Sequence, residues 1–125
     1  MGLDEDELLA GALGMAASRR LKKSVLEIDL SLAITPAAAA ERARQVLDEL
    51  GRELDCRDDG ETSDSQIVGI VPAGAGGLNP AVVTVTIRDA GEGSSKLVVR
   101  GAAKEGLIKQ RAGEVAARRV ADALA

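Results

Sequence analysis

The chain has 125 residues, of which 46% are apolar and 29% charged, and its net charge is −4. This length is typical of a single domain that buries roughly two thirds of the surface of its unfolded chain. Histidine is absent and Cys56 is the single cysteine. The chain therefore cannot form an internal disulfide, a Ser-His-Asp triad or a histidine-containing zinc site. Aromatic residues are also absent, so the core must be built from aliphatic side chains.

The N-terminal part of the chain carries acidic residues at positions 4–7 and basic residues between positions 19 and 23. Opposite charges at the two ends match the dipole of a helix. We expect an amphipathic N-terminal helix over residues 1–23, followed by a single α+β domain over residues 24–125. No apolar run approaches the roughly 18 residues of a membrane span, and an acidic start is unlike a signal peptide. We therefore expect a cytoplasmic protein that does not bind membranes.

Residues 24–34 alternate strictly between apolar and polar side chains, which predicts a half-buried strand. Its inward side chains are Leu26, Ile28, Leu30, Leu32 and Ile34. Thr35 and Pro36 then form an N-cap and first helical residue. Apolar residues at helical spacing extend the predicted helix as far as Leu54.

Three further strands are predicted over residues 66–71, 81–88 and 95–102. A Gly- and Pro-rich connection, 72–80, separates the first two, and residues 89–93 form a hairpin loop between the last two. Apolar residues from Ile108 to Leu124 then predict a C-terminal amphipathic helix.

These elements predict an α+β fold with a four-stranded, mainly antiparallel sheet, two helices on one face and an additional N-terminal helix. Numbering the strands along the chain, we expect the order 2-3-4-1. The first strand is placed beside the fourth because Glu27 and Asp29 can pair with Lys96 and Arg100.

A strand that runs into Thr35-Pro36 and a helix, followed by a three-strand meander and a terminal helix, resembles a shortened helix-grip domain. This scaffold belongs to the START and polyketide-cyclase-like proteins, and the resemblance implies an apolar ligand cavity between sheet and helix. The candidate cavity residues are Leu26, Ile28, Val83, Val85, Leu97, Val99, Ala112 and Ala116. Gly74, Gly76 and Gly77 are the candidate lid. Ala-rich helices approach a sheet closely, so we expect a solid core unless the helix stands away from it.

The sequence contains no convincing catalytic, cofactor-binding or metal-binding arrangement. Asp55, Asp59 and Gly60 match positions of a calcium loop, but Arg57 and Gln66 replace two required ligands. Cys56 has no neighbouring base that would make it a nucleophile. We therefore favour a non-enzymatic role, without a cofactor or metal.

The predicted second strand is apolar on both faces, because Val68 and Ile70 oppose Ile67 and Val71. With Val82 and Val98, its outer side chains would form a patch that needs a cover. The cover would be the N-terminal helix, a second subunit or another protein. We therefore expect a small binding domain for a protein partner or an apolar small molecule.

A nucleic-acid-binding domain is the alternative interpretation. The order helix, three strands, helix over residues 36–125 resembles double-stranded RNA-binding domains. That resemblance implies phosphate contacts by Lys104, Lys109 and Arg111 near the start of the last helix. The sequence pI of about 4.9 and the missing histidine-bearing loop of that family place this alternative second.

Overall fold

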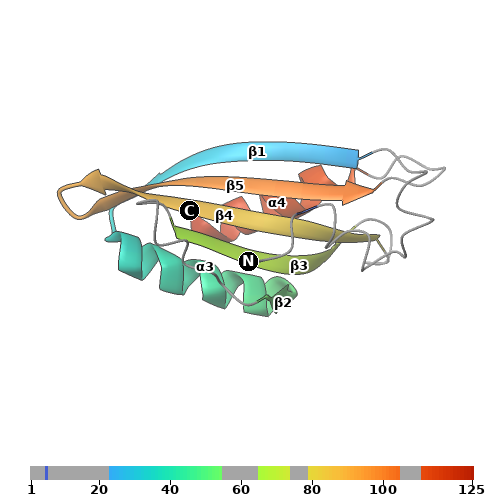
Figure 1. Ribbon diagram of the computed structural model, residues 1–125, viewed down its shortest axis with the longest axis horizontal. Helices are drawn as coiled ribbons and strands as arrows, with labels where there is room; N and C mark the ends of the chain where they lie inside the picture. Colours follow the sequence, from blue (N-terminus) through green and yellow to red (C-terminus); the bar gives the residue numbers. More distant parts are fainter. Residues whose placement is uncertain (1–4, 6–22, 55–64, 74–78, 105–110) are drawn as a thin grey trace.

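Figure 1 shows the computed structural model of the protein, which describes residues 5, 23–54, 65–73, 79–104 and 111–125. The elements in chain order are β1 (Lys23–Leu32), α3 (Pro36–Leu50), β2 (Arg52–Glu53), β3 (Ser65–Ala73), β4 (Asn79–Gly91), β5 (Ser94–Lys104) and α4 (Ala112–Leu124). The fold is α+β, with one sheet and two helices in the described part of the chain. Neither of these helices is long and apolar enough to span a membrane.

The sheet has five strands in the order β1-β5-β4-β3-β2, and every neighbouring pair is antiparallel. The predicted four-stranded sheet with the order 2-3-4-1 is therefore wrong. The missed strand is β2, whose two residues pair with Gly69 and Ile70 at the edge of β3. A strand of two residues is too short to show alternation, and the predicted helix extended across it to Leu54.

The predicted helix over residues 1–23 falls outside the described residues, except at two positions. Glu5 is helical, and Lys23 is already the first residue of β1. The described part of the chain has a five-stranded sheet and two helices.

Helix α3 begins at the predicted position and ends earlier than predicted. The Thr35 hydroxyl accepts a hydrogen bond from the Ala38 amide at 3.2 Å, and Pro36 occupies the first turn. The helix ends at Leu50 because Gly51 passes directly against β3. A Cβ at Gly51 would overlap the carbonyl oxygen of Ile70. The chain can therefore turn straight from the helix into β2.

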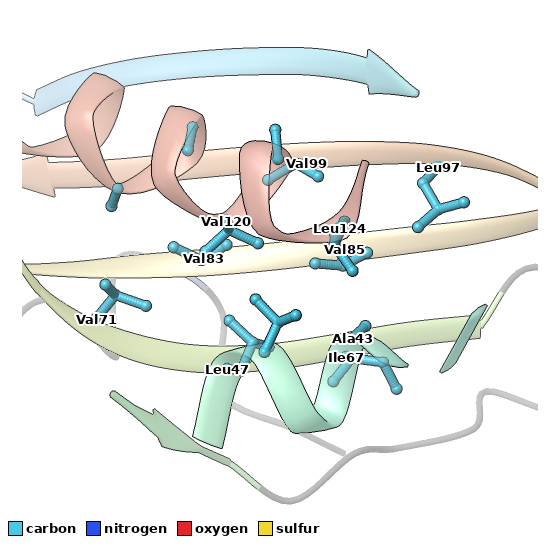
Figure 2. Close-up of a cluster of buried hydrophobic side chains, with 14 of the residues drawn as sticks. Ala43, Leu47, Ile67, Val71, Val83, Val85, Leu97, Val99, Val120 and Leu124 are labelled. Carbon is cyan, nitrogen blue, oxygen red and sulfur yellow. The ribbon is translucent and has the colours of Figure 1, made fainter. Parts of the chain in front are cut away.

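Helices α3 and α4 both cover one face of the sheet, called the inner face here (Figure 2). The inward side chains of β3, β4 and β5 are 0–1% exposed: Ile67, Val71, Val83, Val85, Ile87, Leu97 and Val99. Leu47 of α3 and Val120 and Leu124 of α4 pack against them. Val115 and Ala123, which the helical pattern places inward, are exposed instead. The other predicted inward residues of α4, Ala112, Ala116, Val120 and Leu124, are buried, and Ala117 and Ala121 are buried with them.

The start of α4 touches the sheet backbone to backbone. A Cβ at Gly101 of β5 would overlap the carbonyl oxygen of Gly113, and it would lie 2.9 Å from the Ala117 nitrogen. A Cβ at Gly113 of α4 would in turn overlap the carbonyl oxygen of Ser24 in β1. Glycine is therefore required at both positions, and α4 is held against β1 and β5 without intervening side chains.

The β4–β5 hairpin extends beyond the other strands (Figure 1). The described part of β3 begins opposite Ile87, and β1 ends opposite Ser95. Three consecutive tip residues, Gly91, Glu92 and Gly93, have φ values of 85°, 54° and 74°. The Asp89 carboxylate stabilises this turn by accepting a hydrogen bond from the Gly91 amide at 2.8 Å.

Candidate binding surface

The face of the sheet opposite α3 and α4, called the outer face here, is built from cross-strand rows of side chains. One row is apolar from β3 to β1 and consists of Ile70, Val82, Ala102 and Val25; it ends at Arg52 of β2, which lies opposite Ile70. The next row is mixed and consists of Val68, Thr84, Arg100 and Glu27. The guanidinium of Arg100 therefore belongs to the row next to the apolar row.

The apolar row is buried although both described helices lie on the other face. Val82 is 1% exposed and Ala102 is 0% exposed, and Val25, Val68 and Ile70 pack around them as partly buried side chains. This burial occurs within a single chain. The centre of this row is therefore not open to solvent.

Glu5 is the described residue from outside the sheet that contacts the outer face. Its Oε2 accepts a hydrogen bond from Arg100 Nε at 2.8 Å, and its Oε1 accepts one from Arg100 Nη2 at 3.1 Å. Two parallel hydrogen bonds between a guanidinium and a carboxylate form one of the stronger polar contacts in proteins. The Glu5 side chain is 17% exposed, so the contact is partly desolvated.

Arg100 also contacts Glu27 on the neighbouring strand, with Nη1 and Oε1 3.7 Å apart. The predicted partnership of Glu27 with Arg100 is confirmed, and these two residues are opposite each other in the register. The other predicted pair is not formed across the strands, because Asp29 lies opposite Val98 and Lys96 lies opposite Ser31. Arg100 thus stands between a neighbouring carboxylate on the sheet and a second carboxylate that reaches it from the N-terminal part of the chain.

The eight predicted cavity residues belong to the inner face and its helical cover. Six of them are fully buried at 0–1% exposure: Val83, Val85, Leu97, Val99, Ala112 and Ala116. Leu26 and Ile28 of β1 are partly buried and pack against the same core. Beside them, the Gly101–Gly113 contact leaves no room for a methyl group between sheet and helix. The cavity itself stays a prediction.

The remaining predicted site residues lie partly outside the described ranges. Gly74, Gly76, Gly77 and Lys109 belong to segments that the structure does not describe. Lys104 is half-buried at the end of β5, and its carbonyl oxygen accepts a hydrogen bond from the Asn79 side chain at 2.9 Å. Arg111 is exposed and precedes α4 in a left-handed conformation with φ 53°. Nucleic-acid binding through these cations stays a prediction.

The described residues contain no cluster of three or more His, Cys, Asp or Glu side chains that could hold a metal ion. No protein family matches the chain, and no curated protein sequence is significantly similar to it.

Sequence patterns identified only part of this surface. Val68, Ile70 and Val82 belong to the predicted outer patch, whereas Val25 and Ala102 were not included in it. Glu5 was assigned to a helix-dipole role, and the pattern contains nothing that pairs it with a residue 95 positions away. The register of β1 on β5 is the information that would have completed the apolar row.

Proposed function

We propose that this protein is a non-enzymatic protein-binding domain, and that its binding surface is the outer face of the sheet. The ligand is an amphipathic protein segment that lays apolar side chains on the row Ile70, Val82, Ala102 and Val25. The same segment presents a carboxylate to Arg100. The contact of Glu5 with Arg100, beside a buried apolar row, is the observation that carries this proposal.

The Glu5 contact indicates how a partner segment would bind. A helical residue that presents a carboxylate to Arg100 is already accommodated there within the chain. A partner would offer the same combination of apolar side chains and one acidic residue. It would also have to compete with Glu5 for the guanidinium, and to displace whatever buries Val82 and Ala102.

An apolar small molecule between the sheet and α4 receives less support. The described cavity candidates on β4, β5 and α4 are already buried among one another, and α4 touches the sheet backbone at Gly101. The resemblance to helix-grip domains likewise stays a prediction.

The test uses a synthetic, fluorophore-labelled peptide with the sequence of residues 1–22, added to the full chain. We expect the peptide to bind the Glu5→Gln chain more tightly than the unmodified chain, because the competing carboxylate has been removed. Adding Arg100→Gln to the Glu5→Gln chain should weaken binding about tenfold or more, because hydrogen bonds between charged groups are lost. Binding is measured by fluorescence anisotropy.

Lys96→Gln, in the same Glu5→Gln background, is the matched control for the Arg100 substitution. Lys96 also belongs to the outer face of β5, is exposed, and loses the same charge. The proposal is wrong if the Arg100 and Lys96 substitutions weaken binding equally, or if the peptide binds none of the chains.

A further inference from the structure

Strand β1 forms one edge of the sheet, and its inner side chains are less buried than those of its neighbour. Ile28 and Leu30 are partly exposed, whereas Val99 and Leu97, directly opposite them on β5, are 0% and 1% exposed. Leu32 is also partly exposed. The apolar inner layer thus continues past the part of the sheet that α4 covers.

The edge of β1 lacks three of the features that usually prevent edge-to-edge pairing, namely proline, a bulge and an inward-pointing charge between Ser24 and Leu32. Strand β1 contains no proline, and its ten residues pair with β5 without a bulge. From Ser24 to Leu32, no charged residue points inward. Such a regular edge is a template for a further strand. Its end is also held in place, because the buried Ser95 hydroxyl donates a hydrogen bond to the Ile34 carbonyl oxygen at 2.8 Å.

The charges on β1 disfavour some of the registers that a second copy could adopt. An antiparallel pair with its two-fold axis at Glu27 places Glu27 opposite Glu27 of the partner subunit. An axis at Ile28 places Glu27 opposite the partner's Asp29, and an axis at Asp29 places the two Asp29 residues opposite each other. Like charges in opposite positions destabilise a sheet, so these three registers are disfavoured.

An axis at Leu30 avoids all of these contacts. It places Ile28 opposite the partner's Leu32, Leu30 opposite the partner's Leu30, and Asp29 opposite the partner's Ser31. The partly exposed apolar side chains on the inner face thereby cover one another. On the outer face, each Asp29 carboxylate meets a hydroxyl that can donate a hydrogen bond.

We propose that two copies of this chain form a homodimer by antiparallel pairing of their β1 edges, with the two-fold axis at Leu30. The two five-stranded sheets then join into one continuous ten-stranded sheet. This interface is separate from the surface proposed for protein binding, because it uses the edge of β1 around Leu30 rather than the outer-face rows that contain Val25 and Arg100.

The test compares Ser31→Asp and Ser31→Lys in the full chain by sedimentation equilibrium at micromolar concentrations. By symmetry, Ser31→Asp creates two pairs of opposed carboxylates, which should raise the dimer Kd about tenfold. Ser31→Lys creates two opposite-charge pairs with Asp29 and should lower the Kd. Protein concentration is measured by peptide-bond absorbance, since the chain has no aromatic residue.

Effects on folding are separable from effects on the dimer. Within one chain, Ser31 lies opposite Lys96. Asp at position 31 therefore favours the folded subunit while it weakens the dimer, and Lys does the opposite. Gln45→Asp and Gln45→Lys on the exposed face of α3 are controls for net charge and should leave the Kd unchanged. A monomer at all concentrations, or a Kd that moves in the same direction or not at all with both Ser31 variants, would overturn the proposal.

Discussion

Helices α3 and α4 cover the same face of the sheet but reach it by different contacts. At α4, Gly113 brings the helix backbone against Gly101 and Ser24. At α3, the Leu47 side chain lies over Gly69 of β3. A Cβ at Gly69 would be 3.2 Å from two carbon atoms of Leu47. A backbone contact cannot yield without moving a whole helix, whereas a leucine can change its position slightly. Apart from Gly51 at the end of α3, which also meets a carbonyl oxygen of β3, the α3 side of the core should therefore tolerate more change than the α4 side.

The largest effect is expected for Gly101→Ala. The added methyl overlaps the Gly113 carbonyl oxygen, so α4 must move away from β5. We expect the free energy of unfolding to fall by about 3 kcal/mol or more, at the upper end of overpacking effects. Urea denaturation followed by far-ultraviolet circular dichroism measures this loss. An unchanged stability would mean that α4 stands further from the sheet than the structure has it.

Ala116→Leu tests the α4 side of the core about one helical turn after Gly113. Ala116 is 0% exposed, and a solid core should lose about 1–3 kcal/mol when leucine is forced into it. Ala123→Leu, on the exposed face of α4, is the matched control and should leave stability nearly unchanged. If Ala116→Leu costs as little as the control, an apolar cavity lies beside α4 after all.

Gly69→Ala completes the comparison, since Gly69 and Gly101 are both inward-facing strand glycines. The added methyl approaches Leu47, which can shift, and the Arg52 carbonyl oxygen at 3.0 Å. Relief of the glycine entropy cost, roughly 0.5–1 kcal/mol, offsets part of the crowding. We expect a net change within about 1 kcal/mol, measured by the same denaturation experiment. A loss as large as that of Gly101→Ala would remove the distinction between the two helices.

Glu27→Gln should have the smallest effect and extends the comparison to the outer face. Glu27 is 57% exposed and 3.7 Å from Arg100, and exposed ion pairs contribute about 1 kcal/mol at most. The difference from the unmodified chain should shrink as salt is added, because salt screens exposed charges. Urea denaturation at low and high salt measures this difference in stability. A loss above about 1 kcal/mol that does not change with salt would contradict an exposed ion pair between Glu27 and Arg100.

The sequence predicted those parts of the fold that depend on local patterns. Alternation located β1, and Thr35-Pro36 located the start of α3. The end of α3 at Gly51 could not be predicted, because it depends on the carbonyl oxygen of Ile70 in a different strand. Strand β2 was missed for a related reason, since its two residues are in a strand only because β3 lies beside them.

The candidate surface was predictable to a similar extent. Periodicity identified Val68, Ile70 and Val82 as outward-facing, because strand residues alternate between faces. The continuous apolar row requires the register that joins these strands to Ala102 and Val25. The contact between Glu5 and Arg100 joins distant parts of the chain, and no local pattern encodes such a pairing.

The projecting β4–β5 hairpin has a practical consequence for following this protein in solution. A Cβ at Gly91 or Gly93 would meet nothing within 4 Å, so there is space for a side chain at both positions. Substitution there is limited instead by the positive φ values of the two residues. Glu92, between them, already holds a side chain in the left-handed conformation and is exposed. Exposed loop tips of this kind tolerate insertions well. A fluorescent reporter at residue 92 would give this aromatic-free chain an optical signal while leaving both the outer-face rows and the β1 edge uncovered.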